Sequence, residues 1–431
     1  MGILIDIAYL GLITALSPVL LYRMATREKY RAGFSQRFGN VPCRVGGRKC
    51  IWVHAVSVGE AKIAGLLVKN LEKEFPDWDI VVSTTTNTGQ EIARKELPGR
   101  IIFYYPLDFS WTTRRALRRI RPSCLILIEL ELWPNLLRHA AKAGIPVIVM
   151  NGRITEKGAA RCRWVRRIAP WVFSGESVRL FCVQNETYAG RLRDVGAPMD
   201  CIRTTGMMKY DAMNVEVGPQ AQRRVRKMLG LGGEALVIVG ASVYTDEIVS
   251  LAGIYREARR KFPNARLVLA PRHMEQLNEM RGGIERQGLK VVRRSTASEE
   301  QPADLQGGDA VVLVDTMGEL VDICSVASCV FVGKSLFDSA AGGHNMLEPA
   351  GLGKAVLFGP HTSNFDEEAR LLLEGGGAIR VADAEQLQNE VLGLLASAEK
   401  RNQLGANARQ VVLQNMGATK RNIECFKEIV S

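Results

Sequence analysis

Two series of short apolar runs constrain the fold of this chain more than any other feature of its sequence. The first series starts at Ile51 and ends near Val183, and the second starts at Leu236 and ends near Phe358. The runs are continuous rather than alternating, which is typical of parallel strands buried on both faces, and helical patterns lie between them. This alternation of strands and helices predicts an α/β fold with a doubly wound parallel sheet in each half of the chain.

Residues 203–233 interrupt this rhythm with charges and glycines, and they mark the predicted boundary between two domains. We expect an N-terminal domain over residues 24–210 and a C-terminal domain over residues 211–431. Three helical patterns, at roughly 384–397, 399–414 and 419–430, close the chain, and these last helices can pack back on the N-terminal domain. Two Rossmann-like domains that face a cleft form the GT-B glycosyltransferase architecture, which is the fold class that we predict.

Residues 1–23 predict a membrane anchor. Residues 2–22 are mostly apolar, with Asp6 as the one charge, and they are about long enough to cross a bilayer core of roughly 30 Å. Basic residues follow this stretch and none precedes it, so the positive-inside rule places the body of the protein on the cytoplasmic side. Asp6 and Pro18 weaken a spanning helix, and a helix that lies in the membrane interface is the alternative.

The net charge of +12 is concentrated in the first half of the chain. Residues 1–210 contain 32 Lys and Arg against 17 Asp and Glu, whereas residues 211–431 contain 25 against 28. Such a basic surface suits anionic lipid, a phosphorylated substrate or nucleic acid, and the apolar N-terminus favours a membrane surface with anionic lipid over nucleic acid. A plain solvated helix face is the alternative. Two clusters carry much of the charge: Arg114, Arg115, Arg118, Arg119 and Arg121, and Arg161, Arg163, Arg166 and Arg167.

The nine cysteines are scattered, with no Cys-x-x-Cys pair and none at zinc-binding spacing from a histidine. This pattern predicts reduced thiols in a cytosolic compartment and no metal site. The motif Gly-x-Gly-x-x-Gly is absent after the first strand, where Gly59 stands alone, so a dinucleotide-binding loop is not expected there.

The stretch from Ile51 to Glu60 is the first candidate for chemistry. It has the pattern of a buried strand, a tight turn and the start of a helix. This order places the Glu60 carboxylate at the carboxyl edge of a parallel sheet, where open α/β folds bind their ligands. We predict that Glu60 is a general base, and the alternative is that it only stabilises the helix N-terminus.

Glu129 and Glu131 follow the apolar run at residues 125–128. Strand alternation puts both side chains on one face, so at least one of them is expected to reach the same edge of the sheet. We predict that Glu131 supports the acceptor site or orients neighbouring groups. A carboxylate that only caps the next helix is the alternative.

Four loops of the second half, each just after a predicted strand, predict a nucleotide site. Gly342 and Gly343 allow the backbone to approach a ligand closely, and a helix starting near Asn345 would direct N–H groups at a phosphate. Glu348 is placed to accept hydrogen bonds from ribose hydroxyls, and Arg272 can donate to a phosphate oxygen. Taken singly, each loop can equally be a structural turn. The loops are residues 270–273, 315–320, 342–349 and 359–361.

Eight motifs in a fixed order carry a resemblance to a known family. They lie at residues 54–60 (HAVSVGE), 129–135 (ELELWPN), 151–153 (NGR), 184–186 (QNE), 271–273 (PRH), 315–320 (DTMGEL), 342–345 (GGHN) and 359–361 (GPH). In this order they resemble the 3-deoxy-D-manno-octulosonic acid (Kdo) transferases of lipid A and lipopolysaccharide biosynthesis, glycosyltransferase family 30. The likeness extends from the N-terminus to about residue 415.

The resemblance implies CMP-Kdo as the donor and a tetraacylated, bisphosphorylated lipid A precursor (lipid IVA) as the acceptor, at the inner membrane. It implies Glu60 as the catalytic base, and direct displacement with one base predicts inversion. The leaving group is a single phosphate that Arg272 and a helix N-terminus can stabilise, so no metal and no other cofactor is expected. The implied CMP contacts are Pro271, Arg272, Met317, Gly318, Glu319, Asn345, Met346, Leu347 and Glu348. The candidates for contact with the donor sugar or the acceptor are Ser57, Asn151, Arg153, Lys209 and Ser335.

The sequence departs from the family where relatives usually have Ala-Ser-Thr-His-x-Gly-Glu. Val243, Tyr244 and Asp246 replace the usual threonine, histidine and glycine, and this leaves room for a changed donor preference. Met346 also stands where proline is common, and Lys334 where a second glycine is common. Two alternatives stay open: a GT-B enzyme with another donor, such as a UDP-sugar transferase or UDP-sugar 2-epimerase, and a non-catalytic, membrane-anchored lipid-binding protein.

Overall fold

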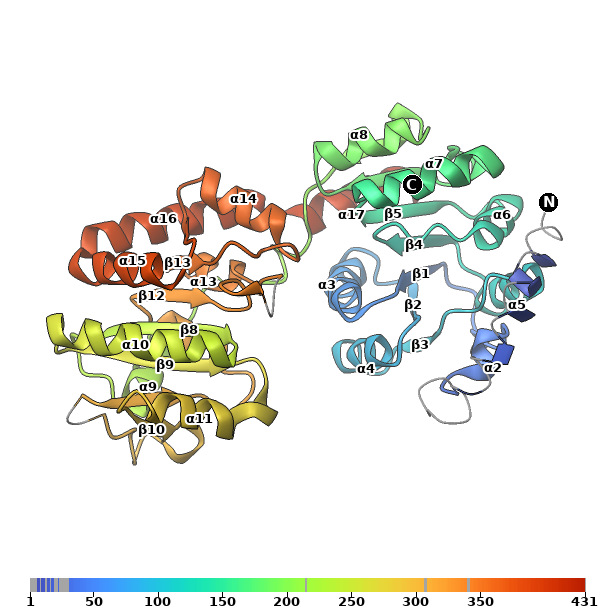
Figure 1. Cartoon of the computed structure of the whole chain (residues 1–431). Helices are drawn as coiled ribbons and strands as arrows, with labels where there is room; N and C mark the ends of the chain where they lie inside the picture. Colours follow the sequence, from blue (N-terminus) through green and yellow to red (C-terminus); the bar gives the residue numbers. More distant parts are fainter. Residues whose placement is uncertain are drawn as a thin grey trace. The chain divides into compact units, whose positions relative to one another are not determined.

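The computed structural model describes residues 6, 7, 9–11, 14, 15, 17, 18, 22, 31–213, 215–305, 308–338 and 342–430. The chain divides into two compact units, Met1–Ala212 with Met416–Ser431, and Met213–Asn415 (Figure 1). Each unit contains a seven-stranded sheet whose neighbouring strands are all parallel. This confirms the predicted pair of doubly wound α/β domains.

The first sheet has the strand order β3-β2-β1-β4-β5-β6-β7. Because the order reverses between β1 and β4, the carboxyl ends of these two strands form the switch point where such sheets bind ligands. The strands are β1 (Cys50–Ala55), β2 (Asp79–Thr84), β3 (Ile101–Tyr104), β4 (Cys124–Ile128), β5 (Val147–Gly152), β6 (Leu180–Val183) and β7 (Ile202–Thr204). The helices are α2 (Phe34–Arg37), α3 (Val58–Glu74), α4 (Asn87–Glu96), α5 (Ser110–Ile120), α6 (Pro134–Lys142), α7 (Glu156–Ile168), α8 (Glu186–Asp194) and α17 (Ala418–Val430).

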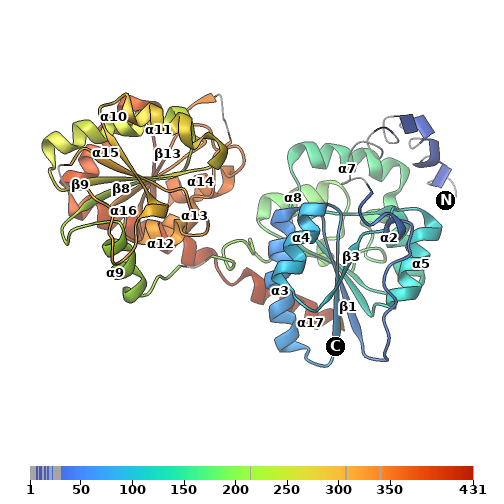
Figure 2. The ribbon, with the colours of Figure 1, turned by 90° about the horizontal axis from the view of Figure 1, so that it is seen from below.

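Burial on both faces explains why the strand sequences are apolar without alternation. On β1, Trp52 packs in the core on one face of the sheet, whereas Ile51 and Val53 pack in the core on the other. Figure 2 shows α3 and α4 on one side of this sheet and α5 on the other.

The C-terminal helix α17 belongs to the first unit, although it follows the last helix of the second unit in the sequence. Phe426 is fully buried in the core that also contains Leu71, and its ring lies 5.2 Å from that of Phe75. The Asp211 carboxylate accepts hydrogen bonds from the backbone N–H groups of Gly417 and Thr419 at the start of this segment.

Polar contacts hold part of the N-terminal stretch to the first unit. The Asp6 carboxylate accepts hydrogen bonds from Ser110 N–H at 2.9 Å and from Asn135 Nδ2 at 3.0 Å, and the Tyr9 hydroxyl donates to Asp108 at 3.4 Å. Most of the predicted anchor, residues 1–23, lies outside the described residues. Within the described part of the chain, no helix combines the length and the apolar character needed to cross a membrane.

The second sheet has the strand order β10-β11-β9-β8-β12-β13-β14, again with a switch point, here between β8 and β12. The strands are β8 (Leu236–Val243), β9 (Ala265–Pro271), β10 (Lys290–Arg293), β11 (Ala310–Leu313), β12 (Cys329–Val332), β13 (Ala355–Phe358) and β14 (Ala378–Arg380). The helices are α9 (Pro219–Met228), α10 (Thr245–Lys261), α11 (Leu277–Glu285), α12 (Leu320–Ser325), α13 (Leu347–Gly351), α14 (Asp366–Glu374), α15 (Ala384–Ala396) and α16 (Ala398–Asn415).

Candidate active site

Glu60 lies at the start of α3, next to the carboxyl end of β1. Ser57 is the N-cap of this helix, and its hydroxyl accepts a hydrogen bond from Glu60 N–H at 3.3 Å. The Glu60 carboxylate accepts in return from the N–H groups of Val56 at 2.8 Å and Ser57 at 3.3 Å, which completes a capping box. The helix-stabilising role is therefore present. A carboxylate offers about four lone-pair positions, so two bonds leave Glu60 the capacity to accept a proton from a substrate.

Two further carboxyl groups, Glu129 and Glu131, lie near Glu60 after the neighbouring strand β4. Strand alternation does not place them on one face as predicted, because β4 ends at Ile128 and Glu129 adopts a left-handed φ of 63°. The structure nevertheless brings both into electrostatic contact with Glu60. Burial, followed by the negative charge of Glu60, raises the pKa of Glu129 and that of Glu131 to about 7.

The three carboxyl groups of this cluster can take different roles in a proton transfer. Because their pKa values are raised, Glu129 and Glu131 retain their protons to higher pH than ordinary carboxyl groups do. A carboxylate that accepts a proton beside two groups that can hold one is a suitable arrangement for general base catalysis. Among the described residues, no group of three His, Cys, Asp or Glu side chains could hold a metal ion.

Aromatic rings pack next to the carboxyl cluster. The His54 ring stacks on Tyr105 at 4.0 Å, and Tyr105 lies 5.8 Å from Trp133. His54 is fully buried, and burial lowers its pKa to about 3, so it is a neutral core residue. Burial raises the pKa of Tyr105, and the charges of Asp108 and Glu131 raise it further. Tyr105 belongs to none of the sequence motifs, and only its position just after β3 could have indicated it.

The other predicted residues of the first unit occupy different positions around this edge. Asn151 is buried with a φ of 56°, and its Oδ1 accepts a hydrogen bond from Met208 N–H at 3.0 Å. It thereby ties β5 to the turn that carries Lys209. Arg153 is exposed, and its charge opposes the rise in the pKa of Glu129, which places it at the carboxyl cluster.

The four predicted nucleotide loops lie at the carboxyl edge of the second sheet. They follow β9, β11, β12 and β13. Together with β8 these four strands are consecutive in the sheet, in the order β11-β9-β8-β12-β13. Backbone hydrogen bonds join two of the loops to the segment after β12: Gly343 N–H donates to Lys334 O at 2.7 Å, and His361 N–H donates to Ser335 O at 3.0 Å.

Arg272, Lys334 and His344 form a group at this edge. Burial lowers the pKa of His344 to about 4, and the charges of Arg272, Lys334 and His273 lower it further. The Tyr244 ring stacks on His344 with an interplanar angle of 19°, and its hydroxyl lies 3.2 Å from His273 Nε2. Two cations beside a neutral imidazole suit a ligand that carries a phosphate or a carboxylate. Tyr244 and Lys334, two of the residues that depart from the family pattern, are thus part of this group.

The turn at residues 317–319 presents its first two residues outward. The Met317 side chain is 85% exposed, and Gly318 has a φ of 88°, which favours glycine. Glu319 is held by Arg294, whose Nη2 donates to it at 2.6 Å, and by the Thr316 hydroxyl. Both of its carboxylate oxygens therefore help to shape the turn, and each keeps a lone pair that a ligand could use.

The segment from Asn345 to Glu348 differs in part from the prediction. The helix α13 starts at Leu347, two residues later than expected, and it has only 5 residues. Asn345 Nδ2 donates to Glu348 Oε1 at 3.1 Å, so these two polar side chains lie together. Met346 and Leu347 are fully buried, so in this structure neither residue offers an exposed atom to a ligand.

Pro271 and Ser335 are buried. The Ser335 hydroxyl donates to Val332 O at 2.6 Å and accepts from Gly359 N–H at 2.9 Å, so it joins two loops and is not accessible to a ligand in this structure.

Glu247 is a buried carboxylate that organises the loops at this edge, and it belongs to none of the eight motifs. It occupies the third position of α10, as Glu60 does in α3, and it is 2% exposed. Its carboxylate accepts four backbone N–H groups, from Tyr244, Lys334, Ser335 and Leu336, at 2.9–3.1 Å. Its lone pairs are saturated, so Glu247 fixes the loop after β12 and is not available as a base.

Solved structures with this fold include enzymes of nucleotide sugars. A glycosyltransferase from Rickettsia africae has a TM-score of 0.59 and 10% sequence identity, over 90% of this chain and 100% of that one. A UDP-GlcNAc 2-epimerase from Neisseria meningitidis, bound to UDP-GlcNAc, has a TM-score of 0.59 and 14% identity, over 88% and 100%. At such identities these likenesses show a shared fold alone.

Sequence comparison is more specific. A family model described as 3-Deoxy-D-manno-octulosonic-acid transferase (kdotransferase) matches residues 32–212. The chain is 31% identical over 424 residues to the 3-deoxy-D-manno-octulosonic acid transferase of Haemophilus influenzae, which covers 98% of this chain and 94% of that protein. It is 30% identical over 407 residues to the enzyme of the same name from Bordetella pertussis, with 91% and 90% covered. The chain therefore belongs to the 3-deoxy-D-manno-octulosonic acid (Kdo) transferase family of glycosyltransferases.

Proposed function

We propose that this protein moves Kdo from CMP-Kdo to a tetraacylated, bisphosphorylated lipid A precursor, with inversion and with Glu60 as the general base. The observation that carries the proposal is the carboxyl cluster of the first unit. Glu60 keeps unused lone pairs, and its charge contributes to the raised pKa of Glu129 and of Glu131. An acceptor hydroxyl that attacks the anomeric carbon must lose its proton, and Glu60 is suited to take it.

The second unit supplies the groups that the donor needs. Arg272 and Lys334 can compensate the charge of the CMP phosphate and the Kdo carboxylate, and the Asn345–Glu348 pair offers donor and acceptor atoms to the nucleoside. The departing phosphate gains negative charge in the transition state. Cations fixed in advance stabilise that charge without further reorganisation.

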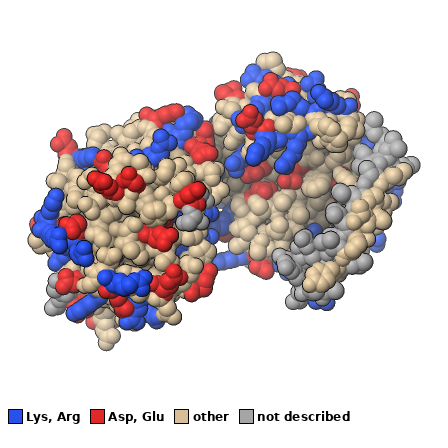
Figure 3. All heavy atoms as spheres, viewed as in Figure 1, with Lys and Arg blue, Asp and Glu red and all other residues tan. Residues whose placement is uncertain are grey.

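A lipid acceptor requires the protein to work at a membrane surface. Trp164 and Ile168 are 63% and 60% exposed on α7, one helical turn apart on the same face. Basic residues of α7 surround them, and Figure 3 shows Lys and Arg gathered over the part of the first unit formed by α7 and α8. Exposed apolar side chains among arginines suit an anionic membrane surface. We propose that this surface and the apolar N-terminus hold the protein at the cytoplasmic face of the inner membrane.

The test is turnover by the purified full chain. It would receive CMP-Kdo generated in situ and the lipid A precursor, with the products identified by mass spectrometry. We expect addition of Kdo by the wild type and a loss of about 10²–10⁴-fold in Glu60→Gln. A preference for a UDP-sugar over CMP-Kdo, or wild-type turnover no faster than that of Glu60→Gln, would refute the proposal. The second result would favour a lipid-binding protein without catalysis.

A further inference from the structure

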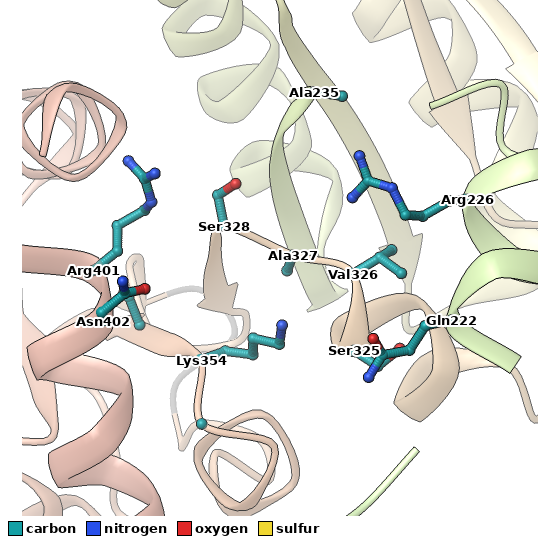
Figure 4. Close-up of a pocket in the computed structure, with 12 residues that line it drawn as sticks. Gln222, Arg226, Ala235, Ser325, Val326, Ala327, Ser328, Lys354, Arg401 and Asn402 are labelled. Atoms are coloured by element: carbon teal, nitrogen blue, oxygen red, sulfur yellow. The ribbon is translucent and has the colours of Figure 1, made fainter. Parts of the chain in front are cut away.

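A cavity of about 320 Å³ opens at the opposite edge of the second sheet, where β8, β12 and β13 begin. The residues just before these strands, Ala235, Ser328 and Lys354, line it. Arg226 of α9 and Arg401 of α16 complete the wall, and Figure 4 shows the three basic side chains around the hollow. The loops of the candidate nucleotide site follow the carboxyl ends of strands in the same sheet, so this cavity is a separate place.

The cavity has an excess of positive charge. Its lining contains Arg226, Lys354 and Arg401 but no Asp or Glu. Neighbouring basic residues on the same helices do have carboxylate partners: Arg224 pairs with Glu299, Lys400 with Glu390, and Arg409 with Glu216. Across the described residues, no carboxylate forms an ion pair with any of the three cations of the cavity.

Both guanidinium groups are fixed in place by backbone carbonyls. Arg226 Nη2 donates to Gly232 O at 2.5 Å and Gly233 O at 3.0 Å. Arg401 Nη1 donates to Leu394 O at 2.6 Å and to Leu395 O at 2.9 Å. Each group is held through one nitrogen, so its other N–H groups can serve a ligand. Such fixed guanidinium groups lose little conformational freedom when a ligand binds.

Lys354 is half-buried beside these arginines. Burial lowers the pKa of its ammonium group, and the charge of Arg226 lowers it further. The Ser328 hydroxyl accepts from Val237 N–H at 3.0 Å, so its own proton can be donated toward the cavity. Like charges held close together without a counter-charge are unfavourable, and an anion would relieve this repulsion.

We propose that this cavity is a second anion site, which binds a phosphoryl group. Guanidinium groups match phosphate oxygens in pairs, and a lysine ammonium adds a point charge. The volume is near the lower limit of ligand pockets, which suits phosphate, pyrophosphate or a small phosphomonoester, either free or as a lipid head group. The site does not depend on the proposed transfer reaction.

The first arm of the test uses free anions. Pyrophosphate and inorganic phosphate are titrated into the full chain by calorimetry, with and without saturating CMP. We expect saturable binding of these anions that CMP does not displace. Lys354→Gln and Arg226→Gln should each weaken this binding by about tenfold or more. Lys290→Gln is the matched control, because Lys290 is exposed at the start of β10 on the same edge of the sheet.

The second arm uses vesicles that contain phosphatidylglycerol and vesicles without it, in a co-sedimentation assay. If the protein binds only the anionic vesicles, and if this binding requires Lys354 and Arg226, the phosphoryl group belongs to a lipid. Circular dichroism checks that each variant is folded, and if one is not, the other carries the test. Affinities that neither cavity variant changes, or no saturable binding in either arm, would overturn the proposal.

Discussion

Glu60 and Glu247 occupy equivalent positions in the two units, yet their hydrogen bonds differ. Glu60 accepts two backbone N–H groups and Glu247 accepts four. A glutamine has one acceptor oxygen and brings N–H donors of its own, so the same substitution should have different results at the two sites. We expect Glu60→Gln to lose most turnover while its free energy of unfolding falls by about 1 kcal/mol, since one capping hydrogen bond is lost.

Glu247→Gln is the matched variant. Its amide nitrogen would face backbone N–H donors in a buried place, and we expect a loss of about 1–3 kcal/mol in the free energy of unfolding. Urea denaturation of both proteins, followed by fluorescence, measures the difference. A destabilisation of Glu60→Gln as large as that of Glu247→Gln would show that Glu60 is mainly a structural residue.

The raised pKa of Glu131 predicts a pH dependence of stability. The pKa of Glu131 is about 7 in the folded protein against an ordinary value of 4.5, so the folded state binds more protons between these values. The contribution of this group is complete below about pH 4.5 and is lost as the pH rises through about 7. Glu131→Gln should therefore lose less stability than the wild type between roughly pH 5 and 8, by on the order of 1 kcal/mol after solvent screening.

Urea midpoints at the two pH values provide this comparison. Glu91→Gln is the control, because Glu91 is exposed on α4 of the same unit. The prediction fails if the wild type and Glu131→Gln have the same pH dependence.

At the scale of elements, α7 is distinguished by what it leaves exposed. Ala159 is its one buried residue, whereas Trp164 and Ile168 face outward. Replacement of both by serine should weaken binding to anionic vesicles by about tenfold, because two apolar side chains would no longer enter the bilayer interface. Met199→Ser is a suitable control, since Met199 is 71% exposed in the same unit but on a different element. Co-sedimentation at low and high salt separates the apolar from the electrostatic contribution to binding. Unchanged binding of the double variant would show that α7 is not the membrane-binding surface.

Strands and helices were predictable because their signals are local. Ile51, Trp52 and Val53 are apolar in succession because their strand is buried on both faces, and the spacing of Ser57 and Glu60 already contains the capping box. A local pattern also gave one wrong prediction, the placement of Glu129 and Glu131 on one face. The alternation that placed Glu129 and Glu131 stopped at the end of β4, since a left-handed residue breaks it.

At the scale of the whole molecule, contacts between distant residues could not be read from the sequence. Asp6 caps α5 through Ser110, 104 residues away, and Glu247 holds backbone groups 87–89 residues further on. Ser335 belonged to a plausible site loop, but its hydroxyl bonds to Gly359 instead of facing a ligand. Such pairings depend on how the strands are ordered in each sheet, and no local pattern encodes that order.

The return of the chain to the first unit has a consequence for how the molecule unfolds. Ending the chain after Asn415 removes α17, including the buried Phe426 and Ile423. It also removes the two backbone N–H groups that donate hydrogen bonds to Asp211. Phe426→Ala alone should cost about 3–5 kcal/mol, because a fully buried ring leaves a cavity. In calorimetry the truncation should therefore lower the melting temperature of the first unit and leave that of the second, whose core cluster contains no residue of α17. Two transitions that shift together would instead mean that the units unfold as one cooperative body.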